Sequence, residues 1–290
     1  MHIINLGSIN IDHVYAVDHL VRPGETIAST RYRVFAGGKG LNQSIALARA
    51  GVNTRHVGRV GAEGGWLLDR LRDEGIDTSA IAISNTPTGH AIIQVTPQGE
   101  NAIVLFGGAN HALAEADLAH ALSTAAPGDC FLLQNETNLA SRAIQMAHER
   151  QMRIVFNPAP MTREVDSYPL EWVDLFILNE TEAEALTGAT DPEQVCRIMR
   201  HRFPRASVVL TLGAHGAMYF DRDSLLHEAA PVVDVVDTTA AGDTFIGYFL
   251  AEWIQSRDPA RSLHQGCRAA SICVTKAGAS DAIPHRADVG

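Results

Sequence analysis

Short apolar segments alternate with amphipathic segments along most of the chain, and this alternation is the strongest constraint on its fold. Runs such as DCFLLQ, MRIVFNP and ASVVLTLG have the length and composition of buried strands, whereas residues 138–150 and 241–256 have the apolar periodicity of helices. Strands that are apolar on both faces belong to parallel sheets covered by helices. The sequence therefore predicts an α/β fold with a mostly parallel central sheet sandwiched by helices.

Two segments depart from this rhythm. Residues 26–35 alternate like a half-exposed strand, and residues 88–107 read as two strands joined by TPQGEN with no helix between them. We expect these segments, within about 12–36 and 87–108, to form a small β-sheet that covers one edge of the central sheet as a lid. No low-complexity linker, repeat or charge block divides the sequence, so we predict a single domain over residues 1–290.

The charge balance limits the partners of this protein. Lys and Arg number 23 against 33 Asp and Glu, which gives a net charge of −10 and argues against binding to nucleic acid or an anionic membrane. The opening MHIINLGSIN lacks the features of a signal peptide, and no apolar run approaches the ~20 residues of a membrane span. Four cysteines show no C-x-x-C spacing, and we expect buried, reduced thiols at Cys130, Cys196, Cys267 and Cys273. We predict a cytoplasmic protein.

Polar side chains follow directly after several predicted strands, where open α/β sheets bind their ligands. These residues are Asn10, Asp12, Glu136, Asn157, Asn179 and Thr211, and also Asp237, which follows the short predicted strand VVDVV at residues 232–236. A cap or turn explains any one of them, whereas their number favours a site. An amide and a carboxylate two residues apart, as in GSINID, could hold vicinal hydroxyl groups, although an Asx-type turn explains that segment equally well.

Two stretches open helices with residues suited to a ligand. AGGKGLNQ, residues 36–43, is a glycine turn that permits close backbone approach and projects Lys39 and Asn42 near a helix N-terminus, without the spacing of a P-loop or of G-x-G-x-x-G. NETEAEAL, residues 179–186, has the spacing of a capping box between Asn179 and Glu182. Its acidic residues equally suit a Mg²⁺ ion that keeps several waters.

A third stretch, TTAAGD at residues 238–243, stands at the entrance of an apolar helix. The N–H groups of small residues there can converge on an anion. Asp243 would stabilise the helix dipole by ~0.3–1 kcal/mol, which is the purely structural explanation. Alternatively, Asp243 could accept a proton from an attacking hydroxyl, as phosphoryl transfer requires beside an anion hole and metal charge.

Taken in order, these motifs resemble the ribokinase-like (PfkB) family of carbohydrate kinases. The resemblance rests on GSINID, GGKGLNQ, NPAP, LNETEAEALTG, TLGAHG, DTTAAGDTF and VTKAGA, and it covers nearly the whole chain. GGKG-x-NQ is more similar to the motif of ribokinases than to those of fructokinases or adenosine kinases. The resemblance implies a parallel sheet with a β lid and ATP-dependent phosphorylation of a sugar hydroxyl, with the 5-hydroxyl of D-ribose as the first expectation.

The resemblance also implies roles for matching residues. The general base would be Asp243, and the anion hole would be the backbone of Ala240, Ala241, Gly242 and Asp243. The sugar would contact Asn10, Asp12, Gly38, Lys39, Asn42 and Glu136. ATP would face Asn179, Thr211, Gly213, Gly216 and Gly242, with Glu182 acting on Mg²⁺ through water. A monovalent cation, K⁺, would lie beside Asp237, Thr239 and the carbonyl groups of Cys273, Lys276 and Gly278.

Three positions depart from the family pattern. The usual G-x-D-x-x-G reads GAEGGW, Cys267 stands at a position near adenine, and Ala282 replaces a small hydroxyl residue beside the cation site. A kinase for another sugar, such as deoxyribose or fructose, or for a nucleoside remains open, as does a non-catalytic sugar- or nucleotide-binding protein. We also expect a homodimer through the lid, because an exposed sheet edge invites pairing.

Overall fold

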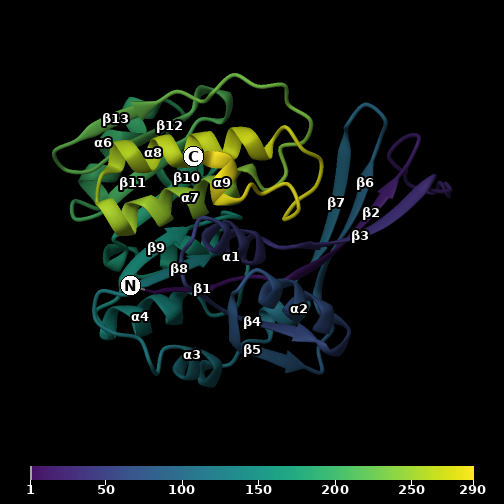
Figure 1. The fold of residues 1–290 in the computed structure, drawn as a ribbon, viewed down its shortest axis with the longest axis horizontal. Helices are drawn as coiled ribbons and strands as arrows, with labels where there is room; N and C mark the ends of the chain where they lie inside the picture. The colour runs from purple at the N-terminus through teal and green to yellow at the C-terminus, as the bar shows by residue number, and fades with distance from the viewer. Residues whose placement is uncertain (1) are drawn as a thin grey trace.

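The computed structural model describes residues 2–290, and within them a nine-stranded sheet runs in the order β13-β12-β11-β10-β9-β8-β1-β4-β5 (Figure 1). All neighbours from β11 to β5 are parallel, whereas β12 and β13 are antiparallel additions at one edge. The strands are β1 (Ile3–Leu6), β4 (Thr54–Gly61), β5 (Asp77–Ser84), β8 (Cys130–Gln134), β9 (Arg153–Asn157), β10 (Leu175–Asn179), β11 (Ser207–Thr211), β12 (Ala217–Phe220) and β13 (Leu225–Glu228). The predicted mostly parallel sheet is confirmed.

Helices cover both faces of this sheet (Figure 1). One face carries α1 (Lys39–Arg49), α2 (Gly65–Asp73), α7 (Ala241–Ser256), α8 (Pro259–Cys273) and the short α9 (Arg286–Val289). The other carries α3 (Glu115–Ala121), α4 (Ala140–Glu149), α5 (Glu180–Thr187) and α6 (Pro192–Arg202). Side chains alternate between the two cores, so Leu132 faces the first while Phe131 and Leu133 face the second.

A separate four-stranded sheet, in the order β3-β2-β6-β7, projects from one side of the molecule (Figure 1). Its strands are β2 (Asn10–Ala16), β3 (Arg31–Gly37), β6 (Gly89–Val95) and β7 (Asn101–Phe106). The predicted hairpin over 88–107 is confirmed, but the expected strand over 26–35 begins later, at residue 31. The register with β2 explains this difference, because Ala16, the last residue of β2, pairs with Arg31.

The expected strand VVDVV, residues 232–236, is wrong. These residues are irregular, and Val232 and Val235 are exposed. The sheet edge beside β12 is instead taken by β13, which the sequence pattern did not single out. The apolar run therefore lies outside the sheet, where its valines line a surface hollow.

The helices α1 and α7 pack against each other without room for a methyl group between them. A Cβ added to Gly247 of α7 would lie 2.3 Å from the Cβ of Ala46 in α1, so only glycine permits this approach. The contact brings the glycine turn at the start of α1 close to the start of α7.

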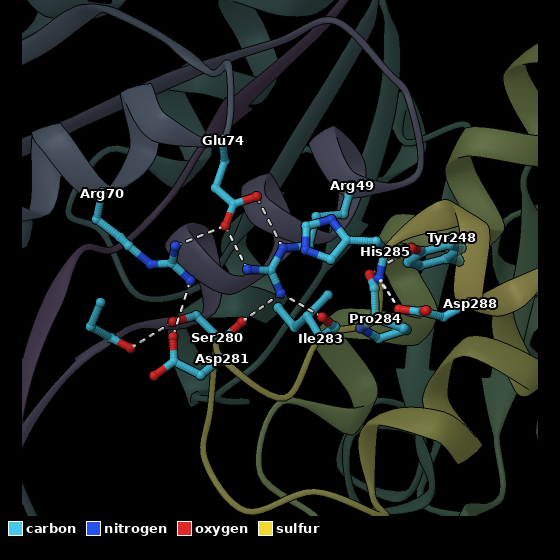
Figure 2. Close-up of polar contacts among 11 residues, drawn as sticks. Arg49, Arg70, Glu74, Tyr248, Ser280, Asp281, Ile283, Pro284, His285 and Asp288 are labelled. Carbon is cyan, nitrogen blue, oxygen red and sulfur yellow. Dashed lines mark hydrogen bonds and ion pairs between the residues drawn. The ribbon is translucent and has the colours of Figure 1, made fainter.

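The far end of α1 is fastened to the C-terminal segment by buried polar contacts (Figure 2). The guanidinium of Arg49 pairs with Glu74 and donates hydrogen bonds to the carbonyl groups of Ser280 and Ile283. Both charged side chains are buried, at 7% and 9% exposure. Burial opposes ionisation of Glu74, but the hydrogen bond and charge of Arg49 outweigh it and lower the pKa of this carboxyl. One buried ion pair thus joins α1, α2 and the segment around residue 280.

All four cysteines are free and buried, as predicted. Across residues 2–290, no helix combines the length and apolar character needed to cross a membrane.

Candidate active site

The glycine turn crosses the end of β1 at very short range. A Cβ added to either Gly7 or Gly40 would lie 2.4 Å from the Cα of the other, so both positions require glycine. Beyond this crossing, the carboxylate of Glu136, which follows β8, accepts hydrogen bonds from the hydroxyl of Ser8 and from the N–H of Lys39 (3.1 Å). Sequence-distant residues of the predicted sugar site therefore meet at the carboxyl ends of β1 and β8.

The two polar residues of GSINID lie on β2, beside this turn. Asn10 is 4% exposed, and its Oδ1 accepts a hydrogen bond from Nδ2 of Asn110 at 2.7 Å. The carboxylate of Asp12 lies over Gly37, where an added Cβ would come within 2.0 Å of a carboxylate oxygen. Burial, reinforced by the negative charge of Glu136, raises the pKa of Asp12 to about 6.

The start of α7 presents Asp243 to the same region. Ala240 caps the helix in the left-handed conformation, with φ of 60°. The carboxylate of Asp243 accepts hydrogen bonds from Nδ2 of Asn42 at 3.0 Å and from Nε2 of Gln43 at 2.9 Å. The N–H of Ala241 donates to the carbonyl of Thr238 at 3.2 Å, which occupies one of the amides of the anion hole predicted over residues 240–243.

Three hollows lie along this edge of the sheet, and the hydrogen bond from the N–H of Lys39 to Glu136 links the linings of the first two. The first, of about 500 Å³, is lined in part by Asn10, Asn110 and Glu136. The second, of about 240 Å³, is lined in part by Lys39, Asn157, Asn179, Glu182, Thr211, Ala240, Gly242 and Asp243. The third, of about 410 Å³, shares Thr211, Thr238 and Gly242 with the second and is lined further by Gly213, Gly216, Ala241, Cys267 and the exposed valines of residues 232–235. The three hollows suit a polyhydroxylated ligand, a reacting centre and a partly apolar ligand respectively.

Carboxylates outnumber cations around the second hollow. Burial opposes the charge on Lys39, but Asp243, Glu136 and Glu182 outweigh it and raise the pKa of the ammonium group. Burial raises the pKa values of Glu136 and Glu182. The ionised form of each carboxylate is therefore disfavoured unless a cation lies nearby. An anionic ligand entering this hollow would therefore need added positive charge.

The capping box of α5 is present, and its acid also faces this hollow. The N–H of Glu182 donates to Oδ1 of Asn179 at 2.8 Å, and the N–H of Asn179 donates to Oε2 of Glu182 at 3.0 Å. The same Oε2 accepts from Nδ2 of Asn157 at 3.3 Å. Among residues 2–290, no group of three or more His, Cys, Asp or Glu side chains is placed to hold a metal ion. A single carboxylate with a raised pKa fits a Mg²⁺ ion bound mainly by water and ligand oxygens.

Asp237 joins the loop before α7 to the loop after α8. Its Oδ1 accepts from the N–H and the hydroxyl of Thr239, at 2.9 and 2.6 Å, and its Oδ2 accepts from the N–H of Gly278 at 3.0 Å. Burial opposes ionisation, but these hydrogen bonds lower the pKa of Asp237. The N–H of Lys276 donates to the carbonyl of Cys273 at 3.1 Å, which folds the second loop back. An ionised carboxylate together with backbone carbonyl groups offers the oxygen ligands that suit a hard monovalent cation.

Several polar residues of the site were assigned no individual role by the sequence analysis. Gln43 was visible as the last letter of GGKGLNQ, and Asn157 as a residue after a strand, but neither position indicated its partner. Asn110 had no signal at all, because it is buried in a short 3₁₀ turn far from Asn10 in the sequence.

Comparison with known proteins matches the sequence and fold of this chain to one class of enzyme. The sequence pattern of the pfkB family carbohydrate kinases matches residues 2–286. The ribokinase of Haemophilus influenzae is 37% identical over 97% of this chain and 94% of its own length. A deoxyribokinase of Salmonella typhi is 30% identical over 98% and 96%.

Solved structures give the same result. The ribokinase of Thermotoga maritima superimposes with a TM-score of 0.88 at 32% identity, over 99% of this chain and 97% of that chain. The ribokinase of Arabidopsis thaliana, solved in complex with ribose and ATP, gives a TM-score of 0.87 at 28% identity with the same coverage. The protein is thus an enzyme of the sugar kinase class with a ribokinase-like fold. The chain belongs to the pfkB family of carbohydrate kinases.

Proposed function

We propose that this enzyme transfers the γ-phosphoryl group of ATP to the 5-hydroxyl of D-ribose. The observation that supports this proposal best is the position of Asp243 in the small hollow, which shares Gly242 with the third hollow and whose Lys39 donates a hydrogen bond to Glu136 of the first. Asp243 accepts the proton of the sugar hydroxyl while the hydroxyl oxygen bonds to the γ-phosphorus. The bond from that phosphorus to the β,γ-bridging oxygen breaks, and ADP leaves.

The sugar occupies the side of the site formed by β2 and the glycine turn. Asp12 and Asn10 hold vicinal hydroxyl groups, because a carboxylate and an amide together accept and donate hydrogen bonds. Gly38 lets the backbone approach the sugar closely. The remaining contacts come from Lys39, Asn42 and Glu136.

ATP occupies the opposite side, with its base in the partly apolar hollow near Cys267 and Val232. Its phosphates point toward Asn179, Thr211, Gly213, Gly216 and Gly242. The excess of carboxylates around Lys39 supports a requirement for cations. Mg²⁺ near Glu182 would supply charge neutralisation at the transferring phosphate, and the amides of Gly242 and Asp243 would donate to it.

The test of this proposal is an ADP-release assay of the purified protein with ATP, Mg²⁺ and K⁺ over ribose, deoxyribose, fructose and nucleosides. We expect the highest kcat/KM with ribose, and a product phosphorylated at the 5-position by NMR. Deoxyribose is the second candidate, because a relative at 30% identity is a deoxyribokinase. A clear preference for deoxyribose would favour that function, and a preference for fructose or a nucleoside would contradict both.

We further propose that K⁺ binds between Asp237, Thr239 and the carbonyl groups of Cys273, Lys276 and Gly278. Replacing K⁺ by a large organic cation such as tetramethylammonium is expected to lower kcat several-fold, because Asp237 orders the loop that leads into α7. Asp237→Asn should remove the difference between the two cations. Equal rates of the unchanged enzyme in both salts would contradict the cation site.

A homodimer through the small sheet is also proposed. β7 exposes Ile103, Val104 and Leu105 at 56%, 67% and 52%, and such a strip favours burial against a second copy. Sedimentation velocity at micromolar concentration should show a dimer, and Val104→Asp should give a monomer. Leu225→Asp, at a similarly exposed site on β13, serves as the control that stays dimeric. A monomer for the unchanged protein would exclude this interface.

A further inference from the structure

A chain of buried, uncharged polar side chains leads from Asp243 into the interior of the protein. The chain consists of five fully buried residues: Gln43, Gln134, Asn5, Ser44 and His56. They come from α1 and from the neighbouring strands β8, β1 and β4, against which α1 packs. Buried polar groups are retained when they are hydrogen-bonded, so the direction of each bond in this chain can be worked out.

The inner end of the chain is fixed by a backbone carbonyl, which can only accept. Nε2 of His56 lies 3.2 Å from the carbonyl oxygen of Gly7, so this nitrogen carries the hydrogen. Burial lowers the pKa of His56 to about 4, and the ring is neutral at pH 7. Its Nδ1 therefore accepts from the hydroxyl of Ser44 at 2.8 Å.

The next two amides follow from a second backbone carbonyl. Nδ2 of Asn5 donates to the carbonyl of Gly40 at 2.9 Å and to Oγ of Ser44 at 2.8 Å. Oδ1 of Asn5 consequently faces Gln134 and accepts from its Nε2 at 3.0 Å. The same Nε2 donates to Oε1 of Gln43 at 2.6 Å.

Gln43 is therefore oriented with its NH₂ group toward Asp243. A second route gives the same orientation: Nδ2 of Asn157 donates to the carbonyl of Ile177 at 3.0 Å, so Oδ1 of Asn157 faces Gln43 and accepts from Nε2 at 3.3 Å. Nε2 of Gln43 thus serves Asp243 and Asn157 together, and Asn157 in turn donates to Glu182.

We propose that Gln43 is a positioning residue for Asp243, held in a single orientation by the buried chain behind it. Asn42 donates to one carboxylate oxygen and Gln43 to the other, which restricts rotation of the carboxylate where it lines the hollow. This inference rests on the proposed role of Asp243.

The test is Gln43→Met, which keeps the length of the side chain and removes the donor. Loss of a hydrogen bond to a charged group is expected to lower kcat by about 10- to 100-fold. KM for the sugar and the calorimetric affinity for it should stay within about twofold of the unchanged enzyme. Ser262→Ala, which removes a fully buried hydroxyl from α8 away from the site, controls for the loss of a buried polar group and should leave kcat unchanged.

A double-mutant cycle then separates positioning from a general loss of structure. If Gln43 acts through the carboxylate, adding Gln43→Met to the Asp243→Asn variant should lower its residual kcat little further. An equal reduction in both backgrounds, or a large rise in the sugar KM at unchanged kcat, would overturn the positioning role. If Asp243→Asn alone kept its turnover, the base assignment itself would fail, which is a distinguishable result.

Discussion

Replacing Asp243 by asparagine is expected to lower kcat at least about 100-fold and to change sugar affinity little. The amide has nearly the shape of the carboxylate but cannot take the hydroxyl proton. It also brings an NH₂ group against the donors of Asn42 or Gln43, which disturbs the geometry locally. The measurement is turnover by coupled ADP release, paired with calorimetric titration of the sugar.

Glu252→Gln provides the matched control for this variant. Glu252 lies on the same helix, and its side chain is 18% exposed and paired with Arg261 away from the site. This substitution removes one negative charge from α7 at a position outside the hollow, so the turnover of the variant should equal that of the unchanged enzyme. Near-normal turnover of Asp243→Asn would contradict the assignment of the base.

Asp12→Asn is expected to raise the sugar KM about 100-fold or more, because two hydrogen bonds to a charged group, each of about 1.5–3 kcal/mol, are weakened. The unchanged enzyme should show a related pH dependence. As pH falls through about 6, Asp12 becomes protonated and the sugar KM rises. Steady-state kinetics between pH 5 and 8 test both statements, and an unchanged KM in the variant would exclude Asp12 from the sugar site.

The same substitution should stabilise the sugar-free protein. The pKa of Asp12 is raised in the folded state from 3.8 to about 6, so the fold disfavours the ionised form, and stability falls as pH rises through that range. Asparagine removes this cost, which amounts to the order of 1–2 kcal/mol at neutral pH after allowance for solvent screening. Thermal unfolding should show a higher Tm for the variant at pH 7 and no difference below pH 4. Identical curves at pH 7 would contradict a strained charge at Asp12.

The sequence predicts those parts of the site that depend on local patterns. The helix that NETEAEAL opens and its cap at Asn179 follow from the spacing of Asn and Glu, and in the structure α5 spans Glu180–Thr187 with Asn179 as its cap. The start of α7 follows from small residues before an apolar run. In both places the signal and its physical cause lie within one helical turn, so pairing between distant segments does not affect the prediction.

Pairing between distant segments is what the sequence could not provide. Gln43 meets Gln134 across 91 positions and Asp243 across 200, and no spacing rule relates such residues. The irregular run at 232–236 failed for a similar reason. Its valines have the composition of a strand, but β13 already pairs with β12 at that edge. Local propensity cannot show that a neighbouring segment has taken the partner.

The close approach of Gly247 to Ala46 fixes the distance between α1 and α7. The helix α1 begins in the glycine turn, α7 carries Asp243 in its first turn, and the absence of a methyl group at residue 247 keeps the two helices in close contact. The small sheet, in contrast, projects from the body of the molecule (Figure 1). If Asp243 is the base, as proposed, an enzyme redesigned for a bulkier sugar would need a reshaped small sheet. Moving α1 away from α7 would instead separate Asp243 from the residues that start α1.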